Sequence, residues 1–340
     1  GTASNYTLTG GTHNFTVNRR AVSVSGTRLY DATTNAVASD LSTHANLVGS
    51  ETLNLSGTGT IASKNVGSNK TVSVGTLALA DGSNGGLAAN YTLSGGTHQL
   101  TVNQRPLNAT LARQYDGTTT AAGSDLSSFD ALQGGETLTM TGSGTAASAN
   151  VANGIAMSSN GTLALADGTG LASNYSLNST VINIAQRVLN SSGSKTYDAN
   201  TDALAGAITL SNLVSGEALN HSGTATISSA NAGSYTITNL SGISIADGSG
   251  GTASNYTLTG GTHNFTVNTK VVSIQGNKIY DGNTTISSGD ITSVSDTVGA
   301  ETLVISGGSG TVSSANAATY ASASINAVSY THLRAHETKT

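Results

Sequence analysis

The sequence predicts an all-β protein made of tandem modules of about 83 residues, and three observations support this prediction. A Tyr-Asp motif recurs four times, with 82 to 85 residues between successive tyrosines. Apolar and polar residues alternate in short runs, which clusters of Gly, Asn, Asp and Ser separate. No segment keeps a period of 3.6 residues over three turns, so no long amphipathic helix is expected.

The alternating runs are the predicted strands. Val22 and Val24 alternate with polar residues, as do Leu100 and Val102. We expect six to eight short strands per module, arranged as a small β-sandwich or a related β-rich fold. A continuous β-solenoid is the alternative, although solenoid rungs repeat every ~20–30 residues and no such shorter period is visible.

Five marker elements follow one another in the same order in each complete module: Tyr-Asp, Gly-Glu or Gly-x-Glu, an Asn before a small residue, Ala-Asp-Gly, and Asn-Tyr. The markers are the tyrosines Tyr30, Tyr115, Tyr197 and Tyr280; the aspartates Asp31, Asp116, Asp198 and Asp281; the glutamates Glu51, Glu136, Glu217 and Glu301; the asparagines Asn65, Asn150, Asn231 and Asn316; the second aspartates Asp81, Asp167 and Asp247; and the closing tyrosines Tyr91, Tyr175 and Tyr256.

The markers predict the boundaries of the modules, which we call repeats. Repeat 1 covers 19–103, repeat 2 covers 104–185, repeat 3 covers 186–268, and a truncated repeat 4 covers 269–328. Residues 1–18 are identical to residues 251–268, so we interpret them as the tail of a preceding repeat. Residues 329–340 bring His, Arg, Glu and Lys into a charge-poor chain, and we interpret them as a non-native tail translated from a sequencing adapter, as in metagenomic assemblies.

Composition excludes several classes of function. The net charge is −5 and the 13 Lys and Arg residues are scattered, which argues against a nucleic-acid partner. No run of ~18 apolar residues is present to form a membrane-spanning helix. The absence of Cys rules out disulfides and zinc–thiolate sites. There is no catalytic or cofactor-binding motif, and the recurrent histidines His13, His98 and His263 stand singly in their repeats, so we expect no enzyme activity, no cofactor and no metal site.

The marker motifs are interpreted first as structural features. The Tyr-Asp element predicts a strand that ends in a turn, where Asp accepts backbone N–H groups two residues on. A basic residue precedes each of these tyrosines by two positions (Arg28, Arg113, Lys195, Lys278). It could pair with the marker glutamate across the repeat, or both charges could be independently solvated. Ala-Asp-Gly with Asn-Tyr predicts a capped turn more readily than a calcium loop, because calcium requires six to eight oxygens.

The ordered motifs resemble the YDG-type repeats of filamentous-haemagglutinin-like bacterial exoproteins, many of them exported by two-partner secretion. The resemblance covers residues 1 to about 328, with Ala32 and Ala199 standing where the motif has Gly. It implies a secreted or outer-surface bacterial adhesin, and it carries no established catalytic residues.

Two functions are compatible with that resemblance. The repeats can be structural spacers of a stalk that contact mainly their neighbours, or they can themselves bind host glycans or matrix. We also expect that, in this fragment, residues 1–18 of one molecule fill the open edge of the truncated repeat of another. The resulting head-to-tail oligomers would be an effect of truncation and not a native function.

Overall fold

The computed structural model describes residues 1–321 and 324–333, and these fall into two compact units. The units are Gly1–Ala185 and Gln186–Thr340, so the division coincides with the predicted boundary between repeats 2 and 3. Both units are all-β, and their only helical segments are single 3-10 turns of three residues among the described residues. The predicted fold class of tandem β modules is thus confirmed.

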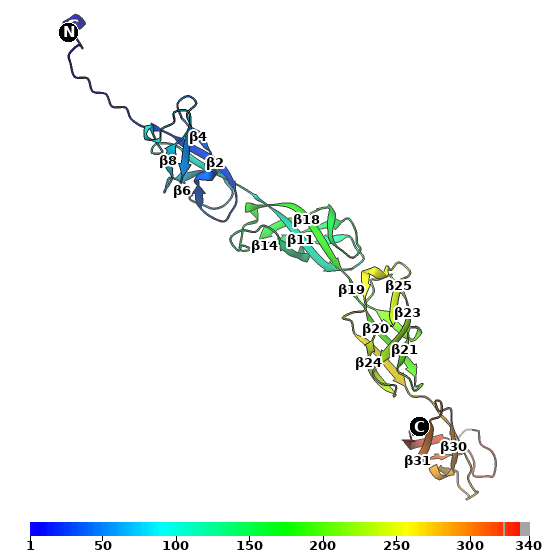
Figure 1. Ribbon diagram of the computed structural model, residues 1–340. Helices are drawn as coiled ribbons and strands as arrows, with labels where there is room; N and C mark the ends of the chain where they lie inside the picture. The colour runs from blue at the N-terminus through cyan, green and yellow to red at the C-terminus, as the bar shows by residue number, and fades with distance from the viewer. Residues whose placement is uncertain (322–323, 334–340) are drawn as a thin grey trace, which may run out of the picture. The chain divides into compact units, whose positions relative to one another are not determined.

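The first unit contains repeats 1 and 2, coloured blue to green in Figure 1. Repeat 1 comprises β1 (Arg20–Ala21), β2 (Ser23–Leu29), β3 (Asn35–Val37), η2 (Ala38–Asp40), β4 (Thr43–Ala45), β5 (Leu53–Ser56), β6 (Thr58–Ile61), β7 (Gly67–Ser73), β8 (Ala78–Asp81), η3 (Ala88–Asn90), β9 (Tyr91–Thr92) and β10 (His98–Asn103). Repeat 2 comprises β11 (Arg105–Gln114), β12 (Thr120–Ala122), η4 (Gly123–Asp125), β13 (Leu126–Phe129), β14 (Leu138–Thr141), β15 (Ser143–Ala146), β16 (Ala152–Ser159), β17 (Ala164–Asp167), η5 (Ala172–Asn174) and β18 (Tyr175–Ala185).

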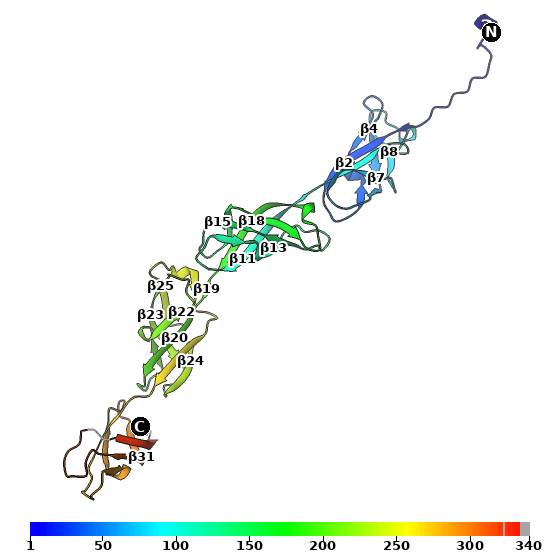
Figure 2. The ribbon, with the colours of Figure 1, turned by 180° about the vertical axis from the view of Figure 1, so that it is seen from behind.

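Each of these repeats has its own six-stranded sheet, ordered β3-β6-β7-β10-β2-β4 in repeat 1 and β12-β15-β16-β18-β11-β13 in repeat 2. Figure 2 shows β2 and β7 of the first sheet from behind. The first and last long strands lie side by side in parallel, with His98 opposite Val24. Small ribbons such as β5–β8 complete the repeat. No sheet runs from one repeat into the next in the described residues, which rules out the continuous solenoid there.

Alternation along the strands builds the core as predicted. Val22 and Val24 are fully buried, and so are Leu100 and Val102 on the parallel partner strand. The core does not stop at the repeat boundary, because Leu138 and Tyr175 of repeat 2 belong to the same cluster of buried residues as Val22. Repeats 1 and 2 are therefore not isolated beads.

The second unit contains repeat 3 and residues 269–333. Repeat 3 comprises β19 (Arg187–Val188), β20 (Asn190–Thr196), β21 (Asp202–Leu204), η6 (Ala205–Ala207), β22 (Ile208–Ser211), β23 (Leu219–Ile227), β24 (Gly233–Asn239), β25 (Ile243–Asp247), η7 (Ala253–Asn255), β26 (Tyr256–Thr257) and β27 (His263–Asn268). The remaining elements are β28 (Ser273–Gly276), β29 (Thr285–Ser287), η8 (Ser288–Asp290), β30 (Ile291–Ser295), β31 (Thr302–Thr311) and β32 (Ser324–Leu333). The sheet of repeat 3 has the order β21-β23-β24-β27-β20-β22, as in the first two repeats.

The strands are more numerous than the six to eight expected per repeat, since repeats 1 and 3 contain ten and nine. The excess comes from short parallel pairs such as β1–β9, which no period-two pattern can reveal in two residues. The strand β32 includes residues 329–333 of the segment interpreted as a non-native tail, whereas 334–340 lie outside the described residues.

Residues 1–18 form a single 3-10 turn, η1 (Ala3–Asn5), and are exposed throughout. Among the helices of the described residues, none is long and apolar enough to cross a membrane.

Candidate functional site

The Tyr-Asp motif forms the predicted turn in all four copies. In the first copy the backbone N–H of Thr33 donates a hydrogen bond of 2.9 Å to Asp31 Oδ1. The same bond, two residues on, is made to each of the other three aspartates, Asp116, Asp198 and Asp281. The prediction that this aspartate caps its own turn is confirmed.

The basic residue before each Tyr-Asp motif pairs with the aspartate of that motif. It therefore neither pairs with the marker glutamate nor stands as an independently solvated charge, the two alternatives that the sequence left open. Arg28 pairs with Asp31, three residues along the chain, and Lys195 pairs with Asp198 at 2.8 Å. The guanidinium of Arg28 also donates to the carbonyl of Thr33 at 2.7 Å. The same basic–aspartate pair recurs in the other two copies, Arg113–Asp116 and Lys278–Asp281. The turn brings the aspartate back to the basic residue, so the glutamate is not needed.

The residue after Tyr-Asp adopts a left-handed backbone conformation in every copy. Gly117 and Gly282 both have φ of 78°, where glycine has no steric penalty. Ala32 and Ala199 adopt nearly the same conformation, with φ of 63° and 61°. An L-residue with a side chain pays roughly 1–2 kcal/mol for this region, so the two alanines are strained relative to glycine.

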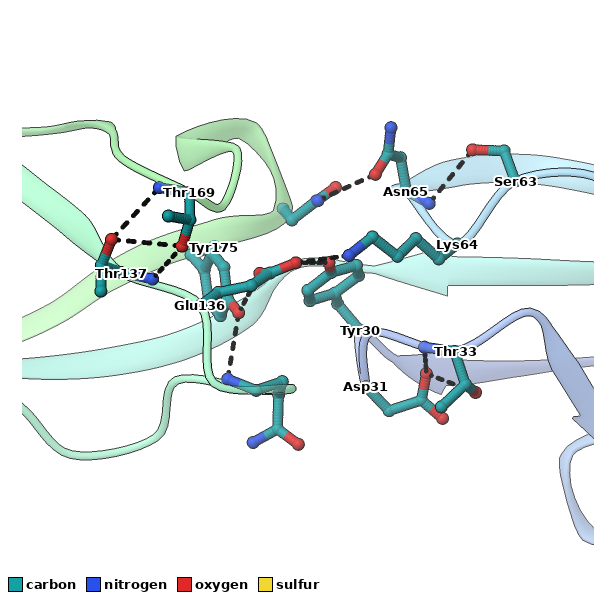
Figure 3. A network of polar contacts seen from close by, with 12 residues as sticks. Tyr30, Asp31, Thr33, Ser63, Lys64, Asn65, Glu136, Thr137, Thr169 and Tyr175 are labelled. Carbon is teal, nitrogen blue, oxygen red and sulfur yellow. Dashed lines mark hydrogen bonds and ion pairs between the residues drawn. The ribbon is translucent and has the colours of Figure 1, made fainter.

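The marker glutamate of repeat 2 lies at the junction with repeat 1, where three side chains donate to it (Figure 3). The Tyr30 hydroxyl and the Lys64 ammonium, both from repeat 1, each lie 2.6 Å from Glu136 Oε1. The hydroxyl of Tyr175, from repeat 2, donates to Oε2 at 2.8 Å. We call Tyr30, Lys64, Glu136 and Tyr175 the clasp.

The clasp is well packed. Tyr30 is fully buried, and only 8% of the Glu136 side chain is exposed. The rings of Tyr30 and Tyr175 meet edge to face, with centroids 5.3 Å apart, an arrangement that aromatic pairs favour. The Lys64 ammonium lies 5.9 Å from the centre of the Tyr30 ring, within cation–π range. A buried carboxylate is tolerated here because donors satisfy both of its oxygens.

The clasp sets the protonation states of its members. Burial alone would raise the pKa of Glu136, but the hydrogen bonds from Lys64, Tyr30 and Tyr175 outweigh burial and lower it. Burial, reinforced by the neighbouring carboxylate, raises the pKa of Tyr175 to about 12. Burial and the bond to Glu136 likewise raise the pKa of Tyr30. The ionised carboxylate and the neutral phenols are therefore the forms that the junction favours.

A second pair of markers reinforces the same junction. Asn174, which precedes the closing tyrosine of repeat 2, is almost fully buried. Its Oδ1 accepts the backbone N–H of Val66 at 2.9 Å, and its Nδ2 donates to Asn65 Oδ1 at 3.1 Å. Arg105 of repeat 2 adds a bond of 2.7 Å to the carbonyl of Tyr30. Four of the five marker elements thus contribute side chains to the contact between repeats 1 and 2, and Ala-Asp-Gly is the exception.

The second unit repeats the principal contact. Tyr197 of repeat 3 donates to Glu301 Oε1, in the residues that follow, at 2.5 Å. The closing tyrosine bonds the glutamate of its own repeat in repeats 1 and 3 as in repeat 2: Tyr91 to Glu51 and Tyr256 to Glu217. Tyr115 is buried, whereas Tyr280 is 67% exposed.

The aspartates of the Ala-Asp-Gly elements cap turns, as predicted. The carboxylate of Asp81 accepts the backbone N–H of Ala88, the first residue of η3, at 2.8 Å. Asp167 and Asp247 do the same at η5 and η7, each at 2.7 Å. One carboxylate oxygen of each aspartate, Oδ1, thus accepts a backbone N–H group as a capping residue does. In the part of the chain that the structure describes, no group of three or more His, Cys, Asp or Glu side chains could hold a metal ion.

The recurrent histidines serve structural roles. His98 and His263 are buried, and the Nε2 atom of each lies 2.8 Å from a backbone carbonyl five residues earlier. Repeat 2 has Thr180 at the corresponding place, and its buried hydroxyl makes no hydrogen bond.

Lys64 is the member of the clasp that sequence reasoning missed. The corresponding positions in later repeats are Ala149, Ala230 and Ala315, so repetition gave no signal. A lone lysine beside a marker asparagine in a chain with only 9% charged residues was the one available indication.

The repeats match one known family of domains. The model of the YDG domain family matches the chain three times, at residues 14–100, 96–182 and 185–264, which together are well over half of its length. No curated protein matches the chain.

Proposed function

Because this chain belongs to the YDG domain family, we propose that its repeats are structural spacers of a large bacterial adhesin, secreted or attached to the outer cell surface. In this role the repeats carry no catalytic function and hold a distal binding domain away from the cell. The filamentous-haemagglutinin-like, two-partner secretion context is part of the same proposal.

The observation that carries this proposal is where the marker residues lie. Tyr30, Glu136 and Tyr175 are buried against one another between two repeats, and the aspartates hold turns. A ligand-binding repeat would be expected to present its recurrent polar and aromatic side chains to solvent instead. Because the recurrent residues are used for contacts between repeats, we infer that the repeats serve mainly to be linked in series.

Force spectroscopy on the full chain tests the spacer role. Each complete repeat should unfold at a resolvable force and release about 28 nm of chain, from about 83 residues at roughly 3.4 Å each. Extension without such steps would show that the repeats do not bear load, and would contradict the proposal.

The second candidate, direct binding of host glycans or matrix, has one observation in its favour. An open cleft of about 470 Å³ lies beside the first Tyr-Asp turn, and Arg28, Asp40 and Arg105 are among the residues that line it. Its two guanidinium groups already bond Asp31 and the Tyr30 carbonyl, which reduces their capacity for a ligand. Saturable glycan binding by the full chain that Arg105→Ala abolishes would favour this candidate over the spacer.

A further inference from the structure

Two segments with the same sequence have different structures in this chain. In repeat 3, residues 251–268 form η7, β26 and β27, and Tyr256 and Phe265 are each 1% exposed. In residues 1–18 the corresponding side chains, Tyr6 and Phe15, are 79% and 91% exposed. The difference lies in the presence of a receiving sheet, since the residues are identical.

The free segment already has the local structure of the buried copy. The turn η1 occupies the same sequence as η7. His13 Nε2 lies 2.7 Å from the Leu8 carbonyl, as His263 Nε2 lies 2.8 Å from that of Leu258. Docking this segment in a sheet should therefore lose less conformational entropy than docking a fully disordered segment.

Repeat 3 shows how such a segment is received. β27 pairs in parallel with β20, with Phe265 opposite Gly193, and in antiparallel fashion with β24. Phe265 and Val267 then enter the core beside Ile208. A Cβ atom on Gly193 would lie 2.3 Å from the Ala207 carbonyl oxygen and 2.7 Å from the Phe265 ring, so only glycine fits between these two neighbours.

The strand β28 is the counterpart of β20, and among the described residues one of its edges is free of any partner strand. In the described residues it pairs with β30 alone, on the side where β20 pairs with β22. Gly276 stands where β20 has Gly193, and a Cβ atom there would likewise lie only 2.2 Å from a backbone carbonyl oxygen, that of Asp290. Beside it, Ile286, Ile291 and Ile305 are only half-buried and line a shallow apolar hollow.

We propose that residues 1–18 of one molecule add to the free edge of β28 in a second molecule. The register of repeat 3 places Phe15 opposite Gly276 and His13 opposite Ile274. Main-chain hydrogen bonds to the edge and burial of Phe15 and Val17 supply the affinity, as in other cases of strand addition. The contact joins different surfaces of the two molecules, so each molecule can bind one neighbour at each end and oligomers can grow head to tail.

Light scattering after size exclusion tests this on the full chain over a wide range of concentrations. The expected result is a series of masses in multiples of 33.6 kDa that grows with concentration. Phe15→Asp should raise the apparent dissociation constant at least about tenfold, because it removes a buried aromatic side chain. Asn14→Asp is the matched control: it adds the same charge, but its counterpart Asn264 points outward from β27.

A synthetic peptide with the sequence of residues 1–18 provides the second arm. Added in excess, it should convert wild-type oligomers to monomers, whereas a Phe15→Asp peptide should not. A mass of 33.6 kDa at every concentration would overturn the proposal. So would oligomers that resist the peptide or that are equally stable in Phe15→Asp and Asn14→Asp.

Discussion

Tyr30 donates a hydrogen bond of 2.6 Å to a carboxylate oxygen of Glu136, which lies 106 residues farther along the chain and in the next repeat. The equivalent bond in the second unit joins Tyr197 to Glu301 across 104 residues. In repeats 1 and 3 the hydroxyl of the first marker tyrosine thus bonds the marker glutamate of the repeat that follows. In these two pairs the marker tyrosine and the marker glutamate serve a contact between successive repeats.

Removing the Tyr30 hydroxyl should weaken repeats 1 and 2 together. We expect Tyr30→Phe to lower the free energy of unfolding by about 1–2 kcal/mol, because a hydrogen bond to a charged acceptor is lost while the ring packing is kept. Hydrogen exchange followed by mass spectrometry should show faster exchange in peptides from both repeats and no change in repeat 3. Faster exchange in repeat 1 alone would contradict the role of the clasp.

Two variants control that experiment. Tyr235→Phe removes a hydroxyl whose contact is a carbonyl 3.4 Å away, so it should have little effect. Glu136→Gln combined with Tyr30→Phe should cost less than the sum of the single changes, with a coupling energy of roughly 1 kcal/mol or more.

Acid should weaken the clasp, because protonation of Glu136 removes the charge that accepts its three hydrogen bonds. The pKa of Glu136 is lowered from its usual 4.5, so its ionised form stabilises the junction fully above pH 4.5. That stabilisation is lost as the pH falls through the lowered pKa. Thermal unfolding of the wild type and of Glu136→Gln should therefore converge in acid and differ near neutrality. A constant difference between them down to pH 2 would contradict the assignment.

Alkaline solution should weaken the same junction through its tyrosines. The pKa of Tyr175 is raised from 10.0 to about 12, so the neutral phenol contributes stability that is fully present below pH 10. This contribution is lost as the pH rises from 10 towards 12. Spectrophotometric titration should show fewer late-ionising tyrosines in Tyr175→Phe than in the wild type, and equal curves would refute the prediction.

Ala199→Gly should stabilise repeat 3 by about 0.5–1 kcal/mol. The gain from relieving a left-handed alanine exceeds the entropy that glycine gains in the unfolded chain. Ala199 is exposed, so little packing is lost. The reverse change, Gly282→Ala, has no steric neighbour within 4 Å and should destabilise its own turn by a similar amount. Differential scanning calorimetry would reveal shifts of opposite sign, and shifts of the same sign would contradict the argument.

The sequence was sufficient to predict strands, repeats and turns because these depend on residues close together in the chain. The partner of Arg28 was predicted wrongly. The two-residue period of a strand places Arg28 on the same face as Tyr30, but the turn after Tyr30 brings Asp31 back to Arg28. The partner of Glu136 could not be found, since no pattern within one repeat specifies contacts with the next. The identical residues 1–18 and 251–268 make the same point: alternation predicts a strand, but only a neighbouring sheet creates one.

Ala230→Lys should extend the clasp to the second unit. Lys64 and Ala230 occupy the same position of the same loop, because in both loops the next residue donates its backbone N–H to the preceding serine, at 3.3 Å for Asn65 and 3.2 Å for Asn231. Glu301 accepts a hydrogen bond from Tyr197, as Glu136 does from Tyr30, but position 230 holds alanine where repeat 1 has Lys64. A lysine at 230 would reach Glu301 and raise the free energy of unfolding by up to about 1 kcal/mol, the range for partly exposed ion pairs. The melting temperature of the second unit should rise by at most about 4 °C.

Ala230→Met supplies an unbranched side chain of similar length without the charge and should give a smaller gain. The gain should also shrink in high salt, and an equal gain in a Glu301→Gln background would show that the lysine acts elsewhere.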